Sequence, residues 1–365
     1  MFVLNGALFG IWASRIPAVA KTHQLTAGNL GILLLLMAAG AIIAFPVAGR
    51  AADTIGCSKV TTRVAVAYVA SLVFIALSPT MLVLAVALFF FGAVHGSMDV
   101  AMNAWAGEVE RASDKPVMSS FHAMFSLGAG LGAASGFFAA TFGLSITTHF
   151  LFAGAVFAAI TLPLAQINWA SQTASRDAAP PLFTLPNGPL LAVGLVAFCA
   201  SLGEGAMADW SAIFLVSTAS VSEAKAALGY TVFSVAMVIM RLMGDRVVHR
   251  IGTVNSARIA GLAAAVGSAI AIVFGTFPMI LLGFALMGVG YAVVMPLAFT
   301  RAANDPDIAP GQAIASVSTL GYGGILLGPP LIGFAAEVTS IRTAFIILTA
   351  LALFIFVFAK VLTRK

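Results

Sequence analysis

The chain has 365 residues, of which 61% are hydrophobic and only 8% are charged. Soluble domains carry roughly 25% charged residues, so this composition excludes a soluble protein and indicates a polytopic membrane protein. The net charge of +5 does not indicate a nucleic-acid partner, because the Lys and Arg residues lie in short loops. Cys57 and Cys199 belong to no CxxC or histidine-rich cluster, so we expect neither a disulfide framework nor a metal site.

Twelve apolar segments follow one another along the chain. A helix needs ~20 residues to cross a bilayer, and each segment is close to that length. We therefore predict an all-α membrane protein with twelve transmembrane helices and no cofactor. Met1 opens directly into an apolar segment without a basic flank, so no cleavable signal peptide is expected. The segments fall at 1–19, 27–48, 60–78, 81–106, 117–141, 147–168, 189–215, 225–244, 255–275, 278–300, 311–336 and 342–361.

The Lys and Arg residues predict the orientation of the helices, since cytoplasmic loops carry the excess of basic residues. Only Arg15, Lys21, Lys225 and Arg342 fall on the other side, which leaves fourteen of the eighteen basic residues after even-numbered segments or at the C-terminus. We predict that both termini are cytoplasmic. The fourteen are Arg50, Lys59, Arg63, Arg111, Lys115, Arg176, Arg241, Arg246, Arg250, Arg258, Arg301, Lys360, Arg364 and Lys365.

The two halves of the chain repeat each other at an offset of 196 residues. Gly92 then falls on Gly288, His95 on Tyr291, and Gly56 on Gly252; the same offset relates Gly128 to Gly324, Gly132 to Gly328 and Arg50 to Arg246. A constant offset across several segments indicates two parallel six-helix repeats. We predict six-helix bundles at 1–168 and 189–365, joined by a polar, Pro-rich cytoplasmic linker at 169–188.

Two loops resemble the cytoplasmic loop motif of the major facilitator superfamily, roughly G-x-x-x-D-R/K-x-G-R/K. They begin at Gly49 and at Arg241, and they depart from the motif at Thr54 and in the longer Asp-to-Gly spacing of the second loop. The resemblance extends to helix count, topology and repeat over the whole chain, and within the superfamily it is nearest to the sugar-permease-like branch that includes fucose permease. It implies a cytoplasmic gate at Gly49, Arg50, Asp53, Gly56, Lys59, Arg241, Asp245, Arg246 and Gly252.

Asp53 and Asp245 have a physical role in such a gate. Each carboxylate can accept from an arginine and lie near the positive N-terminus of a helix. Contacts of this kind would hold the cytoplasmic side shut and release when the halves rock. The alternative is that these charges only fix the topology.

Glycine-rich stretches begin at Gly128 and at Gly321, in the fifth and eleventh segments. Small residues at this spacing let helix backbones approach closely, and helix packing is the favoured interpretation over a hinge. The fifth segment lacks the proline of the related motif of drug/proton antiporters, which argues against drug efflux.

A polar stripe lies inside the fourth segment, where His95, Asp99 and Asn103 are spaced four residues apart. Residues at this spacing share one helix face. A carboxylate in hydrocarbon costs at least ~2.5–3.5 kcal/mol, so this face should point at other helices or at a water-filled cavity. Asp99 and His122 flank the turn near Arg111 at similar distances, which predicts either a proton-binding pair or a static contact.

The resemblance also implies a central cavity, lined by the first, fourth, seventh and tenth segments and their neighbours. Its predicted substrate-contacting residues are Asn5, Trp12, Arg15, His95, Asn103, Ser126, Glu204, Tyr291 and Tyr322, and its proton-coupling residues are Asp99, Glu204 and His122. A bridge from Arg15 to Glu204 or Asp209 is the expected structural alternative. Simple hydration is the alternative for Asp209. For Trp210, anchoring at the membrane interface is favoured over stacking on a substrate.

These features predict a secondary active transporter of a small polar, sugar-like solute. We expect alternating access driven by protons, in a monomer in the bacterial inner membrane. The alternatives are an efflux antiporter and a membrane receptor without net transport. The sequence has no P-loop for ATP and no nucleophile–base pair, so an enzyme is not expected.

Overall fold

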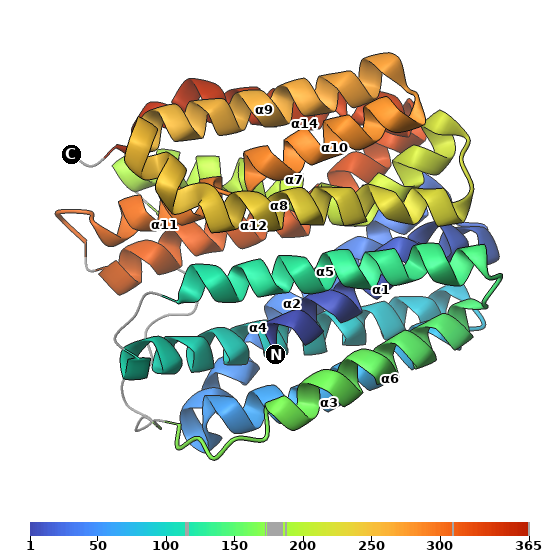
Figure 1. Ribbon diagram of the computed structural model, residues 1–365, viewed down its shortest axis with the longest axis horizontal. Helices are drawn as coiled ribbons and strands as arrows, with labels where there is room; N and C mark the ends of the chain where they lie inside the picture. Colours follow the sequence, from blue (N-terminus) through green and yellow to red (C-terminus); the bar gives the residue numbers. More distant parts are fainter. Residues whose placement is uncertain (114–116, 172, 174–184, 187, 309, 364–365) are drawn as a thin grey trace. The chain divides into compact units, whose positions relative to one another are not determined.

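The computed structural model describes residues 1–113, 117–171, 173, 185–186, 188–308 and 310–363 (Figure 1). All regular secondary structure in these residues is helical, and twelve helical spans are long and apolar enough to cross a bilayer. The predicted all-α fold is confirmed. In unit 1, defined below, the helices are α1 (Phe2–Thr22), α2 (Ala27–Ile55), α3 (Cys57–Ala76), α4 (Met81–Ser113), α5 (Met118–Thr141) and α6 (Ile146–Leu164).

The second half of the chain has more helices than spans, because two of its spans are broken. Its helices are α7 (Pro189–Ala219), α8 (Glu223–Ile251), α9 (Thr253–Phe274), α10 (Phe277–Tyr291), α11 (Val294–Ala303), α12 (Pro310–Val338), α13 (Ile341–Ala344), α14 (Ile346–Phe358) and the 3-10 helix η1 (Ala359–Leu362).

The chain divides into two compact units. Unit 1 comprises Met1–Pro180 and Ser222–Thr231, the latter including the start of α8; unit 2 comprises Pro181–Val221 and Val232–Lys365. Most of the predicted linker 169–188 lies outside the described residues, but Trp169 and Ser171 are described and pack within unit 1.

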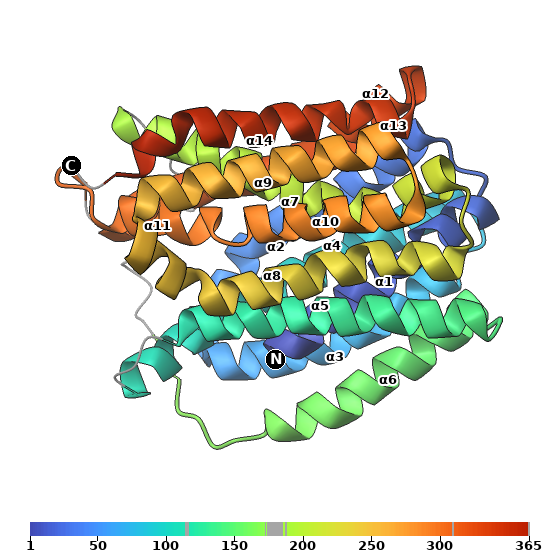
Figure 2. The same cartoon turned by 45° about the horizontal axis from the view of Figure 1, so that its top comes forward.

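Helix pairs within unit 1 approach closely at small residues. The backbone of α1 at Gly6 lies so near α5 that a Cβ atom added there would be 2.0 Å from the carbonyl oxygen of Phe125. The reciprocal contact from α5 is at Gly128, against the carbonyl of Val3. Elsewhere in the unit, α3 and α6 run side by side in both views (Figures 1 and 2). The glycine-rich stretch from Gly128 therefore serves helix packing, as predicted.

The 196-residue repeat appears again in the packing. A Cβ atom added at Gly92 of α4 would lie 1.8 Å from the carbonyl oxygen of Met37 on α2. One added at Gly288 of α10 would lie 2.4 Å from the carbonyl oxygen of Phe233 on α8. Gly92 and Gly288 are 196 positions apart, and so are their partners Met37 and Phe233. Each unit therefore repeats the same helix–helix contact.

The two loop glycines of the resembled motif occupy equivalent backbone positions. Gly56 precedes α3 with φ +95°, and Gly252 precedes α9 with φ +79°. Positive φ is a conformation that glycine adopts without steric cost. The glycine at the end of each motif is therefore required by the turn between two helices.

The predicted span 278–300 is not one continuous helix. The regular α-helix is interrupted at Ala292 and Val293, between α10 and α11, although both residues keep dihedral angles in the right-handed helical region. Pro296 explains the break, because proline has no N–H to donate to the carbonyl of Ala292 and its ring clashes with that carbonyl. The last span is also interrupted, at Phe345, whose carbonyl accepts a hydrogen bond from Ser268 of α9 at 3.2 Å.

Candidate functional site

The polar stripe of α4 is partly exposed and has partners on neighbouring helices of unit 1. The Nδ1 atom of His95 lies 2.9 Å from the hydroxyl of Tyr68, a fully buried residue of α3. The other contact of the His95 ring is with Phe9 of α1, a stacked pair with centroids 5.1 Å apart. Residues from two neighbouring helices therefore fix the orientation of the imidazole while the His95 side chain stays partly exposed.

Asp99 continues the stripe one turn further along α4. Asn103 donates from its amide to the backbone carbonyl of Asp99 at 2.9 Å and to its Oδ1 atom at 3.1 Å. Both side chains are partly exposed, and no basic side chain in the described ranges lies within 4 Å of the Asp99 carboxylate. Such a carboxylate can bind a proton or accept hydrogen bonds from a polar solute.

His122 and Ser126 lie on α5. His122 is exposed, with its ring edge against Phe2 of α1 at a centroid distance of 5.5 Å, and Ser126 is 3% exposed. The pairing of Asp99 with His122 stays a prediction.

Asn5 and Trp12, both predicted to line the cavity, have no exposed surface in this conformation. The Asn5 amide donates to the sulfur of Met102 on α4 at 3.5 Å, while its Oδ1 atom and the indole N–H of Trp12 have no hydrogen-bond partner within the described structure. Trp12 packs against Phe91 at a centroid distance of 6.2 Å. Both residues therefore join α1 to α4, directly behind the polar stripe.

Arg15 and His149 form a buried basic cluster in unit 1, and the sequence analysis did not identify His149. Arg15 is 5% exposed and donates to the carbonyl of Leu144 at 3.1 Å. His149 of α6 is 3% exposed and interacts electrostatically with Arg15, and its Nε2 atom lies 2.9 Å from the hydroxyl of Ser135. A lone histidine in an apolar segment gave no pattern from which this cluster could be predicted.

Glu204 of α7 has a partner that the sequence analysis did not foresee. Its carboxylate lies 3.2 Å from the guanidinium of Arg241 on α8, within unit 2; the Glu204 side chain is 28% exposed and that of Arg241 is 11% exposed. The predicted bridge from Glu204 to Arg15 joins the two units and stays a prediction. Arg241, predicted as a gate residue, neutralises a membrane carboxylate here.

Burial contradicts two interpretations of the following turn of α7, the hydration of Asp209 and the interface anchoring of Trp210. Asp209 is 4% exposed, so it is not hydrated, and Trp210 has no exposed surface, so it is not an interface anchor. The Oδ1 atom of Asp209, the indole N–H of Trp210 and the hydroxyl of Ser211 are buried and have no hydrogen-bond partner among the residues described. The Asp209–Arg15 bridge stays a prediction.

Tyr291 ends α10 at the break in its span. The side chain is 1% exposed, and its ring presses against the backbone of Gly203 on α7: a Cβ atom added at Gly203 would lie 2.2 Å from the ring carbon Cζ. Its hydroxyl has no hydrogen-bond partner in the described part of unit 2. Tyr322 is partly buried on α12.

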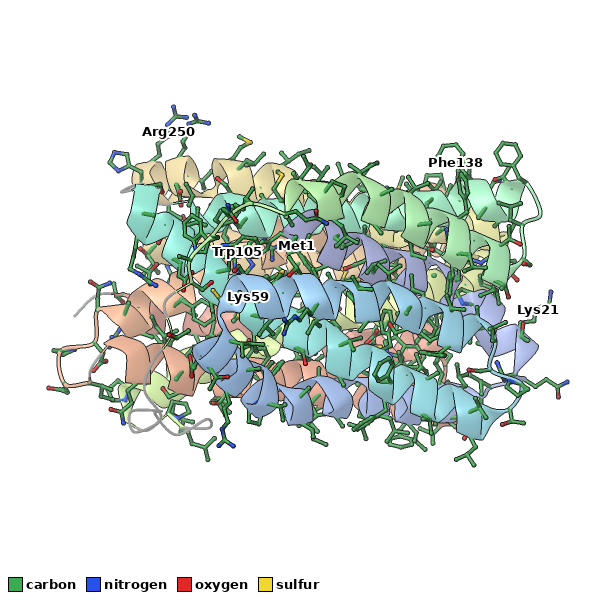
Figure 3. The ribbon with its side chains drawn as sticks, turned by 90° about the horizontal axis from the view of Figure 1, so that it is seen from below. Met1, Lys21, Lys59, Trp105, Phe138 and Arg250 are labelled. Carbon is green, nitrogen blue, oxygen red and sulfur yellow. The ribbon has the colours of Figure 1, made fainter. Side chains whose placement is uncertain are left out.

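The predicted gate loops are exposed. Arg50, Asp53 and Lys59 lie at the α2–α3 corner of unit 1, with Gly49 partly buried and Gly56 buried. In unit 2 the exposed gate residues are Asp245, Arg246 and Gly252. Neither Asp53 nor Asp245 has an ion-pair partner within 4 Å among the described residues, so the latch stays a prediction. Figure 3 shows Lys59 and Lys21 toward opposite ends of unit 1.

Residues 165–171, which we call the strap, lie against the α2–α3 corner of unit 1. The indole of Trp169 donates to Glu108 of α4 at 2.6 Å. The hydroxyl of Ser171 accepts from the backbone N–H of Ser58 at 3.1 Å and lies 3.2 Å from the sulfur of Cys57. Ala165 and Trp169 join an apolar cluster with Trp105 and Met1, which Figure 3 labels close together.

Comparison with known proteins identifies the family. The family model described as Major Facilitator Superfamily matches residues 1–308 and 193–365. An uncharacterised transporter, y4wD, of Sinorhizobium fredii is 45% identical over all of this chain and 96% of its own length. An uncharacterised MFS-type transporter of Yersinia pestis is 35% identical over all of this chain and 94% of its own, and membrane protein MosC of Rhizobium meliloti is 30% identical over 97% and 86%.

Solved structures share the fold at low sequence identity. A mutant of the nucleoside transporter NupG superposes with a TM-score of 0.76 at 13% identity and covers 99% of this chain and 98% of its own. The human organic anion transporter MFSD10 gives 0.69 at 17% identity, with 98% of each chain covered. The chain therefore belongs to the major facilitator superfamily.

Proposed function

We propose that the chain is a secondary active transporter that moves a small polar organic solute across the bacterial inner membrane, coupled to protons. The observation that carries this proposal is the partly exposed stripe His95–Asp99–Asn103 on a membrane-spanning helix. Ionisable groups in transmembrane helices are rare and mark substrate or ion pathways. The relatives are bacterial transporters, so the inner membrane is the expected location.

The stripe favours a solute with several hydroxyl or amide groups. Asp99 and Asn103 offer hydrogen-bond acceptors and donors within one turn, while the stacked rings of Phe9 and His95 offer a flat apolar surface. Sugars and nucleosides combine polar edges with an apolar face, and the structurally similar NupG is a nucleoside transporter. We therefore propose a sugar-like or nucleoside-like substrate.

Asp99 is the proposed coupling residue. It is partly exposed, so it can exchange protons with water, and within the described ranges it has an amide but no cation within 4 Å. Glu204, the second candidate, is neutralised by Arg241. Coupling requires that proton binding and solute binding influence one another, and Asp99 lies one turn from both His95 and Asn103.

Transport in vesicles tests the proposal. A thermal-shift screen against sugars, nucleosides, organic acids and cationic drugs first finds a ligand, since a ligand stabilises the state that it binds. Asp99→Asn should then exchange that solute between vesicle and medium but fail to accumulate it under a pH gradient. Glu204→Gln is the matched control and should still accumulate it. Normal accumulation by Asp99→Asn would refute the role of Asp99, and wild-type exchange without any response to pH would refute proton coupling.

We also propose that both termini are cytoplasmic, on the basis of the distribution of basic residues. A reporter enzyme that works only in the cytoplasm should be active when it is fused after Lys365. Activity solely of a reporter that works in the periplasm would refute this orientation.

A further inference from the structure

Asp209 of α7 is a second buried carboxylate, and the proposed mechanism does not use it. Its side chain is 4% exposed, and its Oδ1 atom is completely covered without a hydrogen-bond partner in the described structure. It lies in the span Pro189–Ala219. Burying an ionised carboxylate without a partner costs far more free energy than burying the neutral acid.

Within the described part of unit 2, Asp209 forms no ion pair. The described ion pairs of unit 2 are Glu204–Arg241 and Arg301–Asp305, and neither includes Asp209. Arg342 of α13 donates to the carbonyls of Ile272 and Val273 at the end of α9. On α7 and the elements that contact it, the described titratable and charged groups are Cys199 and Glu204 on α7, Arg241 on α8, Tyr291 on α10, Arg301 on α11, Tyr322 and Glu337 on α12, Arg342 on α13 and Lys360 in η1.

Glu204, five residues earlier on the same helix, provides the contrast. It is 28% exposed and has a guanidinium 3.2 Å away, so its carboxylate has an oppositely charged partner. The Oδ1 atom of Asp209 is buried and has no hydrogen-bond partner among the described residues. The two carboxylates of this helix therefore lie in different surroundings.

We infer that Asp209 is a proton-binding site of unit 2, separate from Asp99, and that it holds its proton in this conformation. The proton comes from water when the side chain is exposed: the carboxylate takes up one proton and becomes a neutral acid, and the negative charge returns when the proton leaves. Because the group is covered here, exchange requires that its surroundings open. Its use in the transport cycle rests on the proposed proton coupling; its occupancy does not.

Infrared spectroscopy of the purified protein in detergent at neutral pH tests the occupancy. The carbonyl stretch of a neutral carboxylic acid should be present in the wild type and lost in Asp209→Asn. Glu204→Gln is the matched control and should keep that band. If Asp209→Asn instead loses intensity from an ionised carboxylate, or changes neither band, the inference is overturned. This measurement needs no transport, so it can fail or succeed independently of the proposed function.

Thermal unfolding of a second pair of variants keeps the inference testable if Asp209→Asn folds poorly. An unsatisfied neutral acid can be replaced by an apolar side chain of similar size without loss, so Asp209→Leu should melt at or above the wild-type temperature. Glu204→Leu leaves the Arg241 cation without its partner and should melt lower. A lower melting temperature for Asp209→Leu, similar to that of Glu204→Leu, would show that Asp209 is ionised and paired, and would overturn the inference.

Discussion

One added methyl group at Gly203 tests the contact between α7 and α10. In Gly203→Ala the new Cβ atom would lie 2.2 Å from Cζ, 2.5 Å from the hydroxyl oxygen and 2.6 Å from Cε1 of Tyr291. Carbon atoms at their optimal separation lie ~3.5 Å apart or more, so the ring and the helix must separate by about 1.3 Å. The Tyr291 side chain is 1% exposed and has little room to move. Overpacking of this kind typically costs ~1–3 kcal/mol.

Gly205→Ala is the control for this substitution. It adds the same methyl group two residues further along α7, where the nearest atom, the Cα of Ile325, would lie 3.9 Å away. Thermal unfolding in detergent should therefore show a clear loss of stability for Gly203→Ala and little change for Gly205→Ala. Both variants have the same effect on helix propensity, so the difference between them isolates the clash.

A double-mutant cycle identifies the partner in the clash. In a Tyr291→Ala background the ring is absent, so Gly203→Ala should lose most of its cost, and the interaction energy should be measurable because the residues touch. Equal stability of the two alanine variants, or an undiminished cost in the Tyr291→Ala background, would show that the ring does not lie against Gly203.

Three further predictions follow from other parts of the two units. Gly92→Ala and Gly288→Ala should each destabilise the protein by about 1–3 kcal/mol in thermal unfolding, because each added Cβ would collide with a backbone carbonyl of the neighbouring helix. Asp53→Asn and Asp245→Asn should reduce transport in vesicles while expression stays close to normal, since the gate contacts are proposed to act in the cycle and not in folding. Asp305→Asn should weaken the dependence of melting temperature on pH on the acid side.

The contribution of Asp305 to stability changes with pH in a definite direction. Burial alone would raise the pKa of Asp305, but hydrogen bonds from Arg301 and from the backbone N–H of Asp307 outweigh it, and the pKa lies below its ordinary value. The stabilisation is therefore present above the pKa of the unfolded chain and is lost as the pH falls through the folded-state pKa. If the melting temperature of Asp305→Asn falls with decreasing pH as steeply as that of the wild type, this assignment is contradicted.

Control variants and transport measurements test the predictions for the helix-contact glycines and for the two gate aspartates. Gly49→Ala is the control for the helix-contact glycines, since an added Cβ there meets nothing within 4 Å. If it destabilises the protein as much as Gly92→Ala does, the close contact is not the cause. Wild-type transport in both Asp53→Asn and Asp245→Asn would discard the latch.

The features that depend on local pattern could be predicted from the sequence. Twelve spans follow from hydropathy, and the matched glycines Gly56 and Gly252 follow from the repeat. The grouping of His95, Asp99 and Asn103 on one face follows from helical periodicity alone. These predictions needed no knowledge of which helices are neighbours.

The errors lie where a side chain's partner is on another helix. Arg241 was assigned to a cytoplasmic loop because it falls near the end of an apolar segment. The Cα–Cβ bonds of a helix tilt toward its N-terminus, however, so this long side chain extends back along α8 and meets Glu204. Trp210 and Asp209 were placed by the average preferences of Trp and Asp in membranes, whereas packing within unit 2 buries both.

A proline marks the break in the tenth predicted span. Pro296 is visible in the sequence, and an interior proline removes the hydrogen bond to the fourth residue before it. The predicted segment 278–300 was read as continuous because hydropathy does not distinguish a broken helix from a straight one. Tyr291 therefore lies at a helix end and not within a regular turn.

The strap has a consequence for how the N-terminal half can be separated from the rest. A fragment that stops at Leu164, the end of α6, would lack Trp169 and Ser171 and would uncover Trp105 and the thiol of Cys57. Exposed apolar surface of this kind promotes aggregation. Split-protein expression, truncation and tag insertion should therefore place the cut after Ser171, because the chain up to that residue is part of the folded N-terminal half.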